Sequence, residues 1–164
     1  MPEKETKRRA ARDKRQGKAK STQAGEFVRE EIHHVREGKH GARSTKQAIA
    51  IGLSKARRSG VKLPPPKRGK AATKQSARSA NRAAARRARP SATRARAVRR
   101  ALRREGRSAA SRTALSRQAK RTARQRSAAS RSASARRAVR TKGARARKAA
   151  ARKAARTRQR HAAS

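Results

Sequence analysis

The second part of this sequence carries more charge than a folded domain of its size tolerates without counterions. Residues 67–164 contain 35 Lys and Arg but one acid, Glu105, and so have a net charge of +34. Residues 1–66 contain 18 Lys and Arg and 7 acids, a net charge of +11. Like charges at this density repel one another unless counterions or a polyanion screen them. The boundary falls at residues 64–66, three prolines that end any helix.

Large core-forming side chains are scarce as well, with one Phe, one Met and no Trp or Tyr. Residues 67–164 contain 31 alanines, which bury little area each. Low bulky hydrophobicity with high net charge is typical of chains that stay disordered alone. Ala and Arg favour helix, but Arg–Arg repulsion at three- and four-residue spacing opposes it until phosphate binds. The predicted fold class is therefore mostly disordered/all-α: a short helical hairpin followed by a tail that is disordered alone and helix-prone on polyanion binding.

The tail has no fixed repeat, and its breaks are predicted from residue type. Pro90, Gly106, the serine-rich stretch 127–134 and Gly143 should divide it into helical pieces, with 91–105 the best candidate.

Helical periodicity is clearest in residues 21–66. Apolar residues recur on one face of a helix predicted at about 23–37, which Gly38 ends. Ser44 and Gln47 match a capping box, so a second helix is predicted at about 45–58 with Gly60 as its end. The predicted domains are a basic N-terminal arm (1–20), a small helical-hairpin module (21–66) and a low-complexity basic tail (67–164).

Two surfaces of this hairpin lie outside its predicted apolar interface. Ile51 points away from the inner face of its helix, which suggests self-association or a protein partner docking there. Glu26, Glu30 and Glu37 form an acidic stripe opposite the apolar face of the first helix. The stripe is either a solvated surface or a contact for a neighbour's basic arm.

The tail predicts binding to nucleic acid through phosphate contacts and counterion release. Because single-strand and sequence-specific RNA binders rely on aromatic stacking, which this tail lacks, double-stranded DNA is the first expected partner and RNA the alternative. The predicted nucleic-acid-binding residues are the basic side chains of the helix-prone stretches: Arg86, Arg87, Arg89, Arg94, Arg96, Arg99, Arg100, Arg103, Arg104, Arg136, Arg137, Arg147, Lys148, Arg152, Lys153, Arg156, Arg158 and Arg160.

The hairpin also permits a helix-turn-helix interpretation, in which the second helix enters a DNA groove. Lys46, Lys55, Arg57 and Arg58 would then make secondary contacts. A structural or protein-contact role is the alternative, since the loop is longer than the usual turn.

No catalytic motif is present, and neither an enzyme nor a cofactor is expected. A zinc site of His33, Glu37 and His40 is conceivable, but the chain has no Cys and the spacing fits no zinc motif, so no metal is predicted. Neither a secretory signal nor an apolar run of membrane-spanning length is visible, and no stable membrane insertion is expected. The expected location is cytoplasmic, at a bacterial nucleoid.

The stretch KQAIAIGLSKAR at 46–57 is close to the pattern K-Q-A-I-A-I-(G/A)-L-S-x-A-R. Through it, residues 21–66 resemble a family of small, basic bacterial proteins of unknown function. The resemblance implies a bacterial origin and a short helical module, with no established site residues. The tail is similar in composition to the Ala/Lys/Arg-rich extensions of bacterial histone H1-like proteins.

Together these features predict a histone-like, nucleoid-associated protein that binds and condenses DNA largely without sequence specificity. An RNA- or ribosome-associated protein and a cationic protein at an anionic membrane surface are the alternatives.

Overall fold

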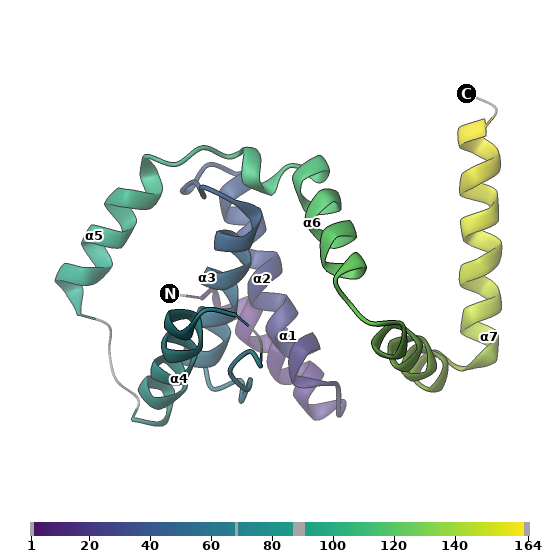
Figure 1. The fold of residues 1–164 in the computed structure, drawn as a ribbon, viewed down its shortest axis with the longest axis horizontal. Coiled ribbons are helices and arrows are strands. Elements are labelled where there is room, and N and C mark those ends of the chain that lie inside the picture. The colour runs from purple at the N-terminus through teal and green to yellow at the C-terminus, as the bar shows by residue number, and fades with distance from the viewer. Residues whose placement is uncertain (1, 68, 87–90, 163–164) are drawn as a thin grey trace. The chain divides into compact units, whose positions relative to one another are not determined.

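The computed structural model describes residues 2–67, 69–86 and 91–162. Most of this length is helical (Figure 1), in the order α1 (Lys4–Arg15), α2 (Lys20–Arg36), α3 (Thr45–Arg58), α4 (Ala71–Ala85), α5 (Ala92–Arg103), the short 3-10 helix η1 (Ser108–Ala110), α6 (Arg112–Arg124) and α7 (Ala128–Ala162). The described residues contain no strand, so the fold is all-α, as predicted. The chain divides into two compact units, Met1–Gln118 and Ala119–Ser164.

The prediction that the tail is disordered is wrong, because α4 to α7 occupy most of it. Ala and Arg are strong helix formers, and each like-charge pair at helical spacing costs only about 0.2–0.5 kcal/mol. Serine side chains also cap three of these segments: Ser91, Ser111 and Ser127 each accept a hydrogen bond from the backbone N–H three residues later. Propensity and capping therefore offset the repulsion that the sequence interpretation had given more weight.

Three of the four predicted tail breaks are present. Gly106 lies between α5 and η1, and Gly143 interrupts α7 with backbone angles of φ 63° and ψ 168°. The third break is at the first residue of the serine-rich stretch 127–134, since α6 ends at Arg124 and α7 begins after the Ser127 cap. Pro90 lies outside the described residues.

Within residues 1–20, predicted as a basic arm, Lys4–Arg15 form α1, which packs along α2. Thr6, Ala10 and Asp13 are buried in this contact. The Arg9 Nε donates to a Glu26 carboxylate oxygen of α2 at 2.7 Å. Part of the acidic stripe of α2 therefore contacts the chain's own N-terminal helix and is not a free surface.

The helices of the 21–66 segment are α2 and α3, which pack closely on each other. The Ser44 hydroxyl accepts a hydrogen bond from the Gln47 backbone N–H at 3.2 Å, so the predicted N-cap of α3 is confirmed. Gly38 and Gly60 follow α2 and α3 with φ angles of 76° and 90°, the left-handed region in which glycine commonly ends a helix.

Gly52 sets how closely α2 and α3 approach. A Cβ at this position would lie 2.7 Å from the Val28 Cα and 3.0 Å from the Phe27 carbonyl oxygen. Phe27 is the single aromatic side chain of the protein and is almost fully buried, in a cluster with Ala10, Ala24, Ala56 and Val61. A glycine in mid-helix therefore allows the only large ring to be enclosed by small neighbours.

A second core cluster includes residues from the predicted tail. Ala109 and Ala110 of η1 are buried with apolar side chains of α2, α3 and the loop between them: Ile32, Val35, Ala42 and Ala48. The Thr45 hydroxyl donates to the Ala109 carbonyl at 2.7 Å, and the Arg36 Nε donates to the Ala110 carbonyl at 2.8 Å. The compact unit thus extends well beyond the predicted boundary at residue 66.

Backbone hydrogen bonds also join the α2–α3 loop to the segment between α5 and η1. The Gly41 N–H donates to the Leu102 carbonyl and the Ala42 N–H to the Gly106 carbonyl, both at 2.9 Å. A Cβ on Gly41 would lie 1.7 Å from the Glu105 carbonyl oxygen, so no other residue fits there without displacing the chain.

The far side of α3 carries α4, whose Ala77 and Ala80 are buried. Asn81 fixes the preceding chain by donating from its side-chain nitrogen to the Leu63 carbonyl at 3.0 Å. Because α3 contacts α2, α4 and η1, Ile51 is half-buried within one chain.

Replacing Gly52 by Ala should destabilise the α2–α3 packing by about 1–3 kcal/mol, because the added methyl group collides with the backbone of α2. Gly25→Ala is the matched control: it lies in α2, no atom stands within 4 Å of its Cβ, and it should stabilise the helix by about 0.5–1 kcal/mol. Hydrogen exchange of α2 and α3 amides measures both. Equal protection in the two variants would contradict the close approach.

Ala110→Leu should destabilise the unit by about 1–3 kcal/mol, since Ala110 has no exposed surface and its pocket holds only a methyl group. Ala150→Leu, at an exposed position of α7, should leave stability unchanged. Denaturant unfolding of the two variants, together with hydrogen exchange of the α3 amides, measures the difference between them. If amide protection in α3 were the same in Ala110→Leu as in the unaltered protein, the packing of η1 into the core would be contradicted.

Candidate nucleic-acid interface and buried polar network

The predicted nucleic-acid-binding side chains lie on the surface of the helices that follow Pro66. All those that the structure describes are exposed: Arg86, Arg94, Arg96, Arg99, Arg100, Arg103, Arg104, Arg136, Arg137, Arg147, Lys148, Arg152, Lys153, Arg156, Arg158 and Arg160. Arg87 and Arg89 lie outside the described residues. Exposure alone makes these cations accessible to a polyanion.

Helix formation gathers many of these cations into stripes. Arg96, Arg99, Arg100 and Arg103 of α5 fall within an arc of about 100° at 3.6 residues per turn. Arg94 points to the opposite side. Leu102, next to this arc, is buried. The helix therefore has a basic exposed face beside one buried apolar side chain.

The longest stripe lies on α7 after Gly143. Six of the eight cations of this stretch fall within an arc of about 140°, leaving alanines on much of the remaining surface. They are Arg145, Lys148, Arg152, Lys153, Arg156 and Arg160. We call this set the α7 stripe.

The sequence interpretation missed a third stripe, on α6. Arg117, Lys120, Arg121 and Arg124 repeat the i, i+3, i+4, i+7 spacing of the α5 set and are all exposed. The sequence does show this stripe, since the same i, i+3, i+4, i+7 spacing that marks an apolar helix face also marks a basic one.

Acids are absent from this part of the chain. Glu105 is the last Asp or Glu in the sequence, and it is half-buried at the joint with Gly41. The α6 and α7 cations therefore have no carboxylate side chain on their own segment to neutralise them.

The structure does not bring the four secondary-contact residues onto one open face of α3. Lys46 and Arg58 are exposed, whereas Lys55 turns toward α2 and Arg57 is buried. The Arg57 guanidinium donates to the Pro64 carbonyl at 3.3 Å, and burial lowers the pKa of Arg57 below its ordinary value. With α4 packed on it as well, α3 does not present the basic surface that a recognition helix needs.

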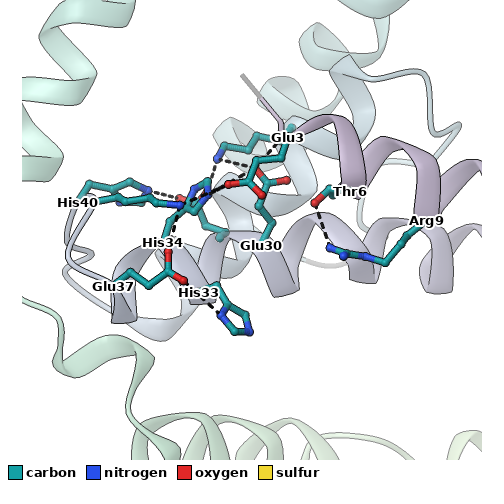
Figure 2. A network of polar contacts seen from close by, with 11 residues as sticks. Glu3, Thr6, Arg9, Glu30, His33, His34, Glu37 and His40 are labelled. Atoms are coloured by element: carbon teal, nitrogen blue, oxygen red, sulfur yellow. Dashed lines mark hydrogen bonds and ion pairs between the residues drawn. The ribbon is translucent and has the colours of Figure 1, made fainter.

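Polar side chains also meet inside the first unit (Figure 2). We define the buried polar network as Glu3, Glu30, Glu31, His34, His40 and Lys55, from the start of the chain, α2, the α2–α3 loop and α3. Glu30 and Glu31 are buried, and the sequence interpretation had placed Glu30 on a solvated or partner-binding stripe. It missed Glu31 altogether, because helical periodicity from α2 alone does not show that α1 and α3 cover opposite sides.

Ion pairs link the members of this network. The Lys55 Nζ lies 2.5 Å from one Glu31 oxygen, and the His40 Nε2 lies 3.2 Å from the other. The His34 Nε2 lies 2.9 Å from Glu3 and 3.8 Å from Glu30. The network thus connects four separate segments through charged groups.

The rim of the network is exposed and carries the shifted pKa values. Hydrogen bonds with His34 and then Lys39 lower the pKa of Glu3, and the Lys39 ammonium likewise lowers the pKa of Glu37. The pKa of Lys39 is raised by the same two carboxylates, Glu37 first.

The trio considered for zinc from the sequence does not assemble. His33 and Glu37 are exposed on α2, with 3.9 Å between the His33 Nδ1 and a Glu37 oxygen. His40 faces Glu31 instead. A loop residue and a buried helical position meet here, which sequence spacing does not reveal.

No helix in the described part of the chain combines the length and apolar character needed to cross a membrane. The large apolar side chains exposed on the described surface are Val98 and Val139, which lie on different helices.

Comparison with known proteins gives one match. Residues 3–68 fit the model of a family of unknown function (DUF6496), about two fifths of the chain. Neither a curated protein nor a solved structure matches. The expected resemblance to a family of unknown function is thereby confirmed for this segment, which contains α1 as well as the predicted 21–66 module. The helices with the basic stripes lie outside the match.

Replacing Lys55 by Met should destabilise the first unit by about 2–3 kcal/mol, because Glu31 would lose its closest cation while remaining buried. Lys46→Met, on the exposed side of the same helix, should change stability by less than about 0.5 kcal/mol. Chemical denaturation compares them, and a tolerated Lys55→Met would mean that Glu31 does not depend on this pair.

Proposed function

We propose that this protein binds and condenses double-stranded DNA without sequence specificity, acting as a histone-like, nucleoid-associated protein and not as an enzyme. The observation that carries the proposal is the set of exposed basic stripes on α5, α6 and α7. From residue 67 onward the one acid that could compete with phosphate is Glu105, which is half-buried.

Charge density supports a duplex partner. The stretch of α7 after Gly143 is 19 residues long, about 28 Å of helix. B-DNA carries one phosphate per about 1.7 Å of axis, so about 17 phosphates lie along that length. The stretch has eight cations to place against them, six of them on one face. Arginine suits this contact because its planar fork binds phosphate oxygens in pairs.

The burial of Phe27, in a chain without Tyr or Trp, favours duplex over single-stranded nucleic acid. Phe27 is 1 % exposed and fills the core between α2 and α3, so it offers no surface on which a base could stack. The stripes also lack the large apolar face that insertion into a membrane surface requires.

The test compares two variants that each lose four charges. Lys148, Arg152, Lys153 and Arg156 in the α7 stripe are replaced by Gln in one; Lys7, Arg8, Arg12 and Arg15, exposed on α1, are replaced by Gln in the other. Because each lost phosphate contact lowers the salt slope by about 0.9, the α7 variant should lose up to about 3.6 units of slope on duplex DNA, and the α1 variant much less. Binding is measured by fluorescence anisotropy across a salt series.

Equal losses in the two variants would show that overall charge, and not the stripes, drives binding. Single-stranded DNA, structured RNA and anionic vesicles serve as competitors near 150 mM salt. We expect duplex DNA to compete best. Stronger competition by RNA or by vesicles would overturn the DNA assignment in favour of that partner.

A further inference from the structure

The buried polar network holds carboxylate oxygens that lack hydrogen-bond donors. Glu31 has no exposed surface, and neither of its oxygens accepts a hydrogen bond; Lys55 and His40 approach them only as ion-pair partners. The Glu30 Oε2 is also without a donor in a side chain that is 2 % exposed. Buried carboxylates in native proteins are usually saturated with donors or bound to a metal.

His40 is oriented in the manner of a metal ligand. Its Nδ1 lies 3.0 Å from the Gly41 carbonyl oxygen, which only accepts, so Nδ1 carries a proton. In the neutral ring Nε2 then has a free lone pair, and it faces the Glu31 Oε1 at 3.2 Å. Two lone pairs facing each other repel unless a proton or a cation lies between them. A backbone carbonyl on Nδ1 with Nε2 directed at the metal is the common arrangement of ligating histidines.

The net charge of the network also favours a bound cation. Glu30 and Glu31 are buried beside one lysine, Lys55, which leaves one negative charge when the histidines are neutral. At the exposed rim, Lys39 pairs with both Glu3 and Glu37. A divalent cation would neutralise this excess in a buried setting where uncompensated charge is unfavourable.

The donors are also close enough to share one ion. One oxygen of Glu31 and one nitrogen each of His34 and His40 all lie within 4.8 Å of one another, and His34 belongs to a second such group with Glu3 and Glu30. Zinc bonds of about 2.0–2.1 Å place tetrahedral ligand atoms about 3.4 Å apart, close to the Glu31–His40 separation. Figure 2 shows Glu3, Glu30, His34 and His40 gathered together at the end of α2.

We propose that Glu31, His34 and His40 bind one divalent transition-metal ion of the zinc class, with a carboxylate of Glu30 or Glu3 beside the fourth position. Two imidazoles with carboxylates suit zinc better than magnesium or calcium, which prefer oxygen ligands alone. Lys55 occupies the other Glu31 oxygen and holds the carboxylate in place. Its three ligands come from α2 and the α2–α3 loop, so the ion would tie the loop to α2.

The experiment is equilibrium dialysis of the full chain against Zn²⁺, with Co²⁺ as a spectroscopic substitute. We expect one ion per chain, a rise in Tm on adding Zn²⁺ and the strong visible absorption of tetrahedral Co²⁺. His40→Gln should weaken binding by about tenfold or more and remove the Co²⁺ band. His34→Gln, a second variant, should do the same.

His33→Gln is the matched control, because His33 is adjacent to His34 but exposed and outside both donor groups. It should bind zinc as the unaltered protein does. Helix content from circular dichroism verifies that each variant is folded. No binding by the unaltered protein at about 100 µM Zn²⁺, or equal binding in the His33 and His40 variants, would overturn the proposal.

Discussion

Eight carboxylates against 53 basic side chains is the constraint on which the rest of the structure depends. Seven of the eight occur in the first 37 residues, and several of them join one element to another. Glu26 joins α2 to α1, and Glu31 joins it to α3 and to the loop. Concentrating the acids here allows helices with many basic residues to pack together. The same concentration leaves the helices after Glu105 without a carboxylate side chain of their own.

Local signals in the sequence were enough to predict the helices of the 21–66 segment. Expected at about 23–37 and 45–58, they lie at Lys20–Arg36 and Thr45–Arg58. Ser44 and the glycines after each helix act through backbone hydrogen bonds and φ angles, which depend on near neighbours in the chain. Such features can be read from a few residues at a time.

What the sequence did not show depends on contacts between distant segments. Ala109 looks like any other alanine of the tail until Thr45 and the α2–α3 loop are in place around it. The burial of Glu31 likewise requires Lys55 and His40, which lie 24 and 9 residues away along the chain. The disorder prediction failed for a different reason: it gave like-charge repulsion more weight than the helix propensity of Ala and Arg and the serine caps of α5, α6 and α7.

The packing of η1 into the core makes two alanines more important for stability than the other alanines of the tail. Of the 31 alanines after residue 66, Ala109 and Ala110 fit against carbonyl and methyl groups of another segment, while most others face solvent. Drift among Ala, Ser and Gln would be nearly neutral along most of α7 but not in this short stretch. A low-complexity region can therefore change its sequence freely over evolutionary time and still contain positions as constrained as those of a conventional core.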